Sequence, residues 1–332
     1  YDLDMVISIP NIDPHIKAFE YIKNTSEEVV VRTGFEAEMR KNLAIPMPAF
    51  VKFHTDTVEK MLAFEFDDPR DRRRFFEAGD NQIAGVGDDF APNTPAWTET
   101  VGSLYPDFPV FGSICEAHEE GWRIIGSENM MLWMGLYPDE LGKFLKRVTE
   151  FTIGVLEGEI AAGGDMLAGM IIFGDVAYVN GMMMSPDHWR RFFKPCVAEQ
   201  IRICHDHDLP VVYHGCGDAR EIFDDLVDIC LDCYNPLEAK AGLDVLELKK
   251  NYAGKLAFLG NMDVQKWAAL DDEELREYVL QKLNAGKGGG YIFASDHSVP
   301  ASVSGTRYDQ VIKLVRQYGD YPLSLGEFDL PI

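Results

Sequence analysis

The chain has 332 residues, 46% of them hydrophobic, and a formal net charge of -24. This length fits one α/β barrel with an extension or two ordinary domains, and one barrel is the simpler interpretation. The negative charge argues against nucleic acid or anionic lipid as a partner, because both need a basic surface. The chain has no signal-peptide pattern and no run of roughly eighteen apolar residues, so we expect a soluble, cytoplasmic protein.

The six cysteines show no regular disulfide spacing, and reduced thiols are expected. Cys230 and Cys233 form a CxxC within DICLDCYNP, whose apolar surroundings predict a buried strand. Three-residue spacing on a strand points the two side chains to opposite faces, which favours a structural role over a redox or metal site.

Residues from about 13 to 80 contain DPHIKAFEYIKN, TGFEAEMRKNLA and DPRDRRRFFEAG, which are polar-rich and begin with capping residues. Such segments predict helices. We therefore expect an N-terminal helical extension over residues 1–80 and a (β/α)8 TIM barrel over residues 81–332, because from about residue 81 short apolar runs alternate with long amphipathic segments.

The predicted strands share an apolar body and a polar end. They are NQIAGVG, MLAGMIIFGD, LPVVYHG, VDICLDCYN, KLAFLGNMD and GGYIFASDH, and the predicted helices cover 138–162, 186–206, 218–228, 243–251, 272–286 and 305–318. In a parallel barrel the carboxyl ends of all strands meet at one mouth, so these polar residues should converge there. A doubly wound sheet would alternate similarly, but its GxGxxG motif is missing.

The sharpest local feature is LPVVYHGCGD, in which His214 and Cys216 stand two residues apart at a strand end. This spacing on a strand directs both side chains to the same side, so a nitrogen and a sulfur can bind one zinc ion. His297 ends another predicted strand at the same mouth and would make three protein ligands, which leaves a fourth position open for catalysis. The alternative for His297 is a loop histidine, or an acid–base group without metal.

Carboxylates at strand ends are candidates for acid–base chemistry, and we favour Asp175 and Glu238 as catalytic residues. Helix N-capping is the alternative for each. We expect His205 and His207 to end a helix, and His118 and His188 to be surface or helix-start residues. The expected substrate-binding residues lie at strand ends or in the loop VAYVNGMMMSP, whose methionines could equally be core: Asp88, Tyr178, Met182, Met184 and Asn235.

Three stretches together resemble the uroporphyrinogen decarboxylase superfamily, specifically its cobamide-dependent methyltransferase branch. They are GDVAYVNGMMMSPDHWRRFFKP, VVYHGCGDAREIFDDLVDICLDCYNPLEAKAGLDVLELKKNYAGKLAFLGNMD and GGYIFASDHSVPASVSGTRYDQVIKLVRQYG. The resemblance covers most of residues 165–320 and implies a (β/α)8 barrel. In that branch the HxC supplies two zinc ligands, here His214 and Cys216. The third is commonly a cysteine, and this sequence has His297 at that place.

The resemblance implies methyl transfer from a small methylated donor to the Co(I) corrinoid (cobalamin) of a partner corrinoid protein. The segment SDH, in which His297 replaces the usual cysteine, and the aromatic and methionine residues, among them Trp122 and Trp133, favour a methoxylated aromatic donor. The alternatives are a methylcorrinoid:thiol methyltransferase of the coenzyme M type, a decarboxylase-like enzyme, and a non-catalytic tetrapyrrole-binding barrel. The arginine-rich N-terminal motif of the true decarboxylases is not found. The oligomeric state is left open, with a homodimer as one option.

Overall fold

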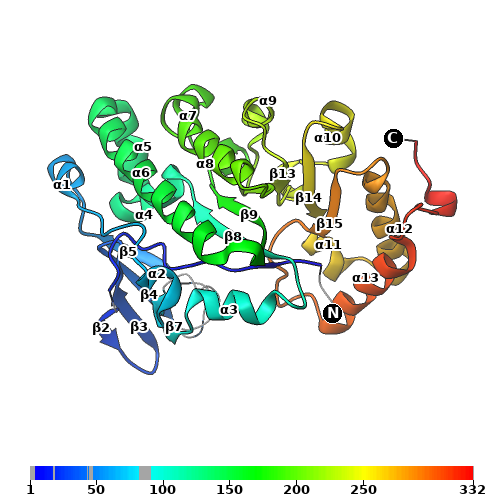
Figure 1. The fold of residues 1–332 in the computed structure, drawn as a ribbon. Coiled ribbons are helices and arrows are strands. Elements are labelled where there is room, and N and C mark those ends of the chain that lie inside the picture. Colours follow the sequence, from blue (N-terminus) through cyan, green and yellow to red (C-terminus); the bar gives the residue numbers. More distant parts are fainter. Residues whose placement is uncertain (1–3, 18, 43, 45–47, 82–90, 332) are drawn as a thin grey trace. The chain divides into compact units, whose positions relative to one another are not determined.

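The protein's computed structural model describes residues 4–17, 19–42, 44, 48–81 and 91–331 (Figure 1). The chain forms two compact units. The N-terminal unit consists of Asp2–Gly174 and Asp187–Pro210, and the C-terminal unit consists of Asp175–Pro186 and Val211–Ile332. This division differs from the proposed one at residue 80, which stays a prediction.

The N-terminal unit contains three parallel strands and a separate antiparallel sheet. The parallel strands, in the order β1–β8–β9, are β1 (Val6–Ile7), β8 (Val110–Cys115) and β9 (Leu167–Phe173). The antiparallel strands are β2 (Glu20–Asn24), β3 (Glu28–Arg32), β4 (Ala37–Asn42) and β5 (Ala49–Phe53), with a short pair β6 (Gly79–Asn81) and β7 (Ala91–Thr94). The helices are α1 (Val58–Ala63), α2 (Arg73–Phe76), α3 (Trp97–Leu104), α4 (Ala117–Ile125), α5 (Ser127–Leu136), α6 (Pro138–Gly163), α7 (Pro186–Phe192) and α8 (Lys194–Asp206), with a 3-10 turn η2 (Gly164–Met166).

The helical extension predicted over residues 1–80 is wrong for most of its length, because β2–β5 occupy much of it and, among its described residues, only the short α1 and α2 are α-helical. In β4 the side chains of Ala37, Met39 and Lys41 are buried while those between them are more exposed, which is the two-residue period of a strand. The turn before β4 places Glu36 at a positive φ of 54°, so Thr33 begins a turn and not a helix.

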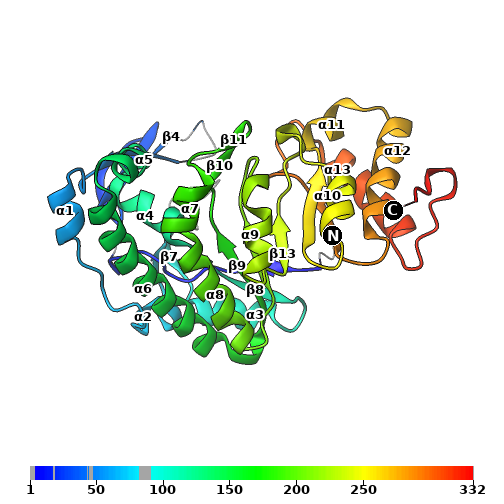
Figure 2. The ribbon, with the colours of Figure 1, turned by 90° about the horizontal axis from the view of Figure 1, so that it is seen from above.

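The C-terminal unit alternates strands and helices and carries the predicted site. Its parallel strands, in order, are β12 (Val211–His214), β13 (Cys233–Asn235), β14 (Ala257–Met262) and β15 (Tyr291–Ser295). The helices are α9 (Phe223–Asp228), α10 (Val245–Tyr252), α11 (Val264–Ala269), α12 (Asp272–Leu283) and α13 (Gly305–Tyr318) (Figure 2). Shorter elements are the hairpin β10 (Ala177–Tyr178) and β11 (Gly181–Met182), and the 3-10 turns η3 (Arg220–Ile222), η4 (Ala239–Ala241), η5 (Asn284–Gly286) and η6 (Gly326–Phe328).

This alternation of parallel strands and helices is an α/β fold of the barrel type, as predicted, whereas closure into eight strands stays a prediction. Strand β13 is shorter than expected because α9 still covers residues up to Asp228 and Cys230 has a positive φ of 62°. Of the two cysteines in the CxxC, Cys230 is therefore exposed in a turn and Cys233 is buried in a strand. Within the described ranges, no helix has both the length and the apolar character needed to cross a lipid bilayer.

Asn261 in β14 fixes the loop that follows β13. Its Oδ1 accepts from the backbone N–H of Val245 at 3.0 Å and from Lys282 Nζ at 2.6 Å. Its Nδ2 donates to the carbonyls of Leu237 and Leu243 at 3.0 and 2.8 Å. The side chain is fully buried, so these four bonds replace all of its contact with water. The loop that leads from Leu237 to Leu243 contains Glu238.

We predict that Asn261→Ala destabilises the protein by several kcal/mol, because each buried polar group left without a partner costs about 1–3 kcal/mol. Urea-induced unfolding measures the change. The matched control is Asn251→Ala, because Asn251 is exposed in α10 and its replacement should alter the free energy of unfolding by less than about 0.5 kcal/mol. Equal effects of the two changes would contradict the role assigned to Asn261.

Candidate metal and active site

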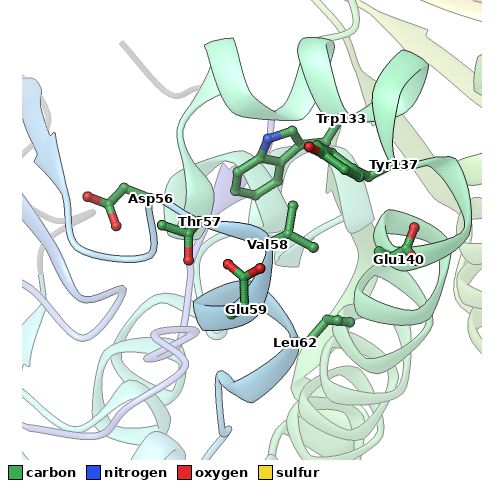
Figure 3. Close-up of a pocket in the computed structure, with 8 residues that line it drawn as sticks. All are labelled: Asp56, Thr57, Val58, Glu59, Leu62, Trp133, Tyr137 and Glu140. Carbon is green, nitrogen blue, oxygen red and sulfur yellow. The ribbon is translucent and has the colours of Figure 1, made fainter.

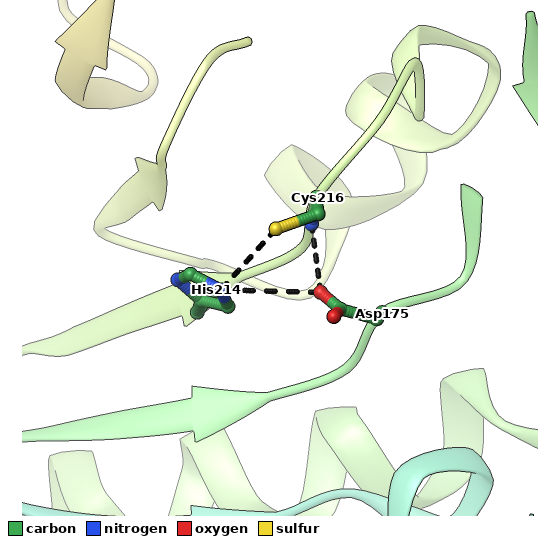
Figure 4. Close-up of side chains that lie close together, drawn as sticks. All are labelled: Asp175, His214 and Cys216. Carbon is green, nitrogen blue, oxygen red and sulfur yellow. Dashed lines mark hydrogen bonds and ion pairs between the residues drawn. The ribbon is translucent and has the colours of Figure 1, made fainter. Parts of the chain in front are cut away.

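Three donor atoms meet at the end of β12. Cys216 Sγ lies 3.6 Å from His214 Nε2, so the two side chains do point to the same side (Figure 4). Asp175 Oδ1 lies 3.9 Å from the same nitrogen and accepts a hydrogen bond of 2.8 Å from the backbone N–H of Cys216. A nitrogen, a sulfur and a carboxylate oxygen thus face one point.

A second donor group shares Cys216 with the first. Cys216, Glu238 and His297 have ligand atoms that all lie within 4.8 Å of one another. Glu238 follows β13 and is buried, whereas His297 follows β15 and is exposed. Asp175 and Glu238, the two carboxylates expected to be catalytic, therefore also lie where ligands of a metal ion would lie. Their roles, like that of His297 as third ligand, stay predictions.

Burial raises the pKa of the Cys216 thiol, and the charges of Asp175 and then Glu238 raise it further. Lys240 Nζ lies 3.3 Å from Glu238 Oε2. A divalent cation bound beside Cys216 would counteract the two carboxylates and favour the thiolate, because a bound metal is the largest charge in such a site.

Gly217 lets the loop after Cys216 pass close to the hairpin β10–β11. It has a φ of +83°, and a Cβ there would lie 2.6 Å from the carbonyl oxygen of Tyr178. The same oxygen accepts a 2.9 Å hydrogen bond from the backbone N–H of Asp218. The hairpin and the loop that carries Cys216 are therefore joined backbone to backbone.

The expected substrate-binding residues differ in exposure. Tyr178 is 64% exposed and Met182 is half-buried, whereas Met184 is 7% exposed and belongs to the core. Asn235 ends β13, with its side-chain oxygen 2.6 Å from His214 Nδ1. Asp88 lies outside the described residues. Substrate binding by these residues stays a prediction.

Asp296 joins three of the loops at this edge and was not singled out from the sequence. Its Oδ2 accepts from the N–H of Ala239, its Oδ1 from the N–H of Val264, both at 3.0 Å, and its own N–H donates to the carbonyl of Met262. It is buried, and burial raises the pKa of its carboxyl group. Asp296 therefore sets the positions of its sequence neighbour His297 and of Glu238.

Four other histidines lie in or next to helices, as expected. His205 lies in the last turn of α8 and His207 is its C-cap, while His188 lies in α7. His118 lies in the first turn of α4 and is buried, so it is not a surface residue.

A separate cavity of about 520 Å³ lies in the N-terminal unit, where Trp133 and Tyr137 face the helix α1 (Figure 3). It is lined by Asp56, Thr57, Val58, Glu59, Leu62, Trp133, Tyr137 and Glu140. None of the predicted metal or catalytic residues lines it. Trp122, the other tryptophan considered for the substrate pocket, instead donates from Nε1 to Glu119 at 3.0 Å.

A model of the family described as Uroporphyrinogen decarboxylase (URO-D) matches residues 98–318. No curated protein matches the chain. A solved methyltransferase from Methanosarcina mazei has a TM-score of 0.58 and 17% identity, over 81% of this chain and 72% of that one. A B12-independent methionine synthase from Shewanella sp. W3-18-1 has a TM-score of 0.46 and 12% identity, over 70% of each chain. At such identities the first similarity shows a shared fold.

We predict that Gly217→Ala destabilises the protein more than Gly254→Ala does. Both glycines have positive φ, so alanine is strained by roughly 1 kcal/mol at either. Only at Gly217 does the new Cβ meet backbone, whereas nothing lies within 4 Å at Gly254. Chemical unfolding should therefore show an additional loss of about 1–3 kcal/mol for Gly217→Ala. Indistinguishable losses would mean that the contact with Tyr178 does not constrain the loop.

Proposed function

The chain belongs to the uroporphyrinogen decarboxylase (URO-D) family, and on this basis we propose that it is a zinc-dependent methyltransferase. The methyl group would pass from a small methylated donor, a methoxylated aromatic ether, to the Co(I) corrinoid of a partner corrinoid protein. The observation that supports this most directly is the meeting of His214, Cys216 and Asp175 around one point. The fold shared with the Methanosarcina mazei methyltransferase means that the scaffold accommodates methyl transfer.

The donor atoms fit zinc. Zinc binds nitrogen at about 2.0–2.1 Å and thiolate sulfur at about 2.3 Å, and tetrahedral angles then separate nitrogen from sulfur by roughly 3.5 Å. Cys216 Sγ and His214 Nε2 are 3.6 Å apart. The mixed nitrogen, sulfur and oxygen set also suits zinc better than calcium or magnesium, which prefer oxygen donors alone.

In this proposal His214 and Cys216 hold the ion, and His297, which shares a donor group with Cys216 but not with His214, supplies the third ligand. Zinc bound there would act as a Lewis acid on the oxygen of the donor ether. The methyl carbon would exchange its bond to this oxygen for a bond to cobalt. Asp175 or Glu238, both beside Cys216, would deliver the proton that turns the departing phenolate into a phenol.

The hairpin β10–β11 is the candidate wall for the methyl donor. Tyr178 and Met182 lie on it, and the backbone contact at Gly217 connects it to the loop of Cys216. An exposed aromatic ring and a flexible thioether suit an aromatic ether, because both make favourable contacts with an aromatic ring.

We predict that the purified protein holds about one zinc per chain, and that His214→Ala, Cys216→Ala and His297→Ala each reduce this to below roughly one tenth, since a site with two remaining ligands binds zinc weakly. Elemental analysis of protein purified without chelator gives the content. Asp175→Asn and Glu238→Gln identify the third ligand: a loss in either one, with full zinc in His297→Ala, would assign that ligand to the carboxylate.

Matched controls are His207→Ala and Cys230→Ala, which remove the same donor types from exposed positions and should leave the zinc content unchanged. A wild-type protein that neither contains nor takes up zinc would refute the zinc mechanism. The activity test is demethylation of methoxyaromatics with a Co(I) corrinoid protein. Transfer from a methylcorrinoid to a thiol instead would assign the protein to the coenzyme M type, and loss of CO2 from a porphyrinogen would make it a decarboxylase.

A further inference from the structure

Asn235 stands directly opposite His214 in the parallel pair β12–β13. Its side-chain Oδ1 lies 2.6 Å from His214 Nδ1, and its Nδ2 donates to the carbonyl oxygen of Leu259 in β14 at 3.2 Å. One side chain thus connects the imidazole to the backbone of the next strand. We infer that Asn235 is a positioning residue that sets which ring nitrogen of His214 faces the metal site. This inference rests on the proposed function only for the identity of the metal ion.

The carbonyl of Leu259 determines the orientation of the Asn235 amide. A carbonyl oxygen can only accept, so the amide nitrogen must face Leu259 and the amide oxygen must face His214. The reversed orientation would bring two oxygens together at Leu259. Because Oδ1 is an acceptor, the proton of the neutral imidazole lies on Nδ1.

With its proton on Nδ1, His214 presents the lone pair of Nε2. This is the nitrogen 3.6 Å from Cys216 Sγ and 3.9 Å from Asp175 Oδ1, so the coordinating atom is the one that faces the other donors. A histidine ligand whose second nitrogen donates to a fixed acceptor has a defined tautomer and ring orientation before the metal arrives.

Gly215, the residue between the two donors, is held by β13, the strand of Asn235. The N–H of Gly215 donates to the backbone carbonyl of Asn235 at 2.9 Å, and the hydroxyl of Tyr234 donates to the carbonyl of Gly215 at 2.7 Å. Tyr234 is fully buried, so its bond is shielded from water. Asn235 therefore acts on the imidazole from a segment that is already fixed, and the inference concerns its side chain alone.

The first test reads the tautomer in metal-free protein. Nitrogen-15 NMR of histidine-labelled protein distinguishes Nδ1–H from Nε2–H imidazole, and His214→Gln identifies the His214 signal by its loss. We expect the Nδ1–H form in the wild type and in Asn235→Asp, which keeps an acceptor oxygen for Nδ1 although it loses the hydrogen bond to Leu259, and a shift toward Nε2–H in Asn235→Leu. An Nε2–H imidazole in the wild type would overturn the inference, whether or not the protein binds zinc.

The second test is the zinc dissociation constant, measured by competition with a chromophoric chelator. Asn235→Leu should weaken zinc binding about 10- to 100-fold, and Asn235→Asp should weaken it less, because it keeps the acceptor for Nδ1 but loses the hydrogen bond to Leu259. Asn129→Leu is the matched control, because Asn129 also donates from Nδ2 to a backbone carbonyl, that of Ile125, but belongs to the N-terminal unit. Unchanged zinc affinity in a folded Asn235→Leu would contradict the inference, whereas a wild type that binds no zinc but keeps the Nδ1–H form would refute only the proposed function.

Discussion

The parallel pairing of β12 with β13 is the constraint on which the candidate site depends. It places His214 opposite Asn235, and β13 holds Gly215 at both of its peptide groups: the backbone carbonyl of Asn235 accepts from the Gly215 N–H, and the Tyr234 hydroxyl donates to the Gly215 carbonyl. Because Gly215 stands between His214 and Cys216, holding this residue fixes the directions from which imidazole and thiol approach each other. A shift of the pairing by one residue would turn the imidazole toward the other face of the sheet. Register, and not the HxC spacing alone, therefore makes the two donors converge.

Charge explains why this convergence favours a cation. Asp175 and Glu238 approach a half-buried thiol whose pKa burial and these carboxylates raise. A divalent ion that binds these donors only in the folded state would stabilise the protein. The gain in the free energy of unfolding rises with the logarithm of the ratio of the ion's concentration to its dissociation constant. The backbone hydrogen bond from Cys216 to Asp175 offsets part of the negative charge, but it also holds the carboxylate beside the sulfur. The geometry thus places two carboxylates beside the thiol, and a divalent ion bound there would offset their charge.

The sequence predicted the features of this unit that depend on neighbours along the chain. The helix expected at 305–318 is α13 with the same limits, since a serine cap and a regular apolar period mark it. The strands that end in His214 and Ser295 were found from apolar runs followed by polar residues. The meeting of His214 with Cys216 was expected from the two-residue period of a strand, although β12 ends at His214 and Cys216 lies in the loop that follows it.

Features that depend on contacts between distant residues could not be predicted from such local patterns. The segment of β2–β5 was misread because capping residues begin turns as readily as helices, and only pairing with other strands decides between them. The bonds of Asp296 to Ala239 and Val264 span 57 and 32 residues, and no local pattern announces them. The same reasoning applies to Asp175, which a 41-residue contact brings to Cys216. A sequence can name such a carboxylate as a candidate, but whether it comes close enough to Cys216 to act as a ligand or a proton donor is decided only by the packing of distant segments against each other.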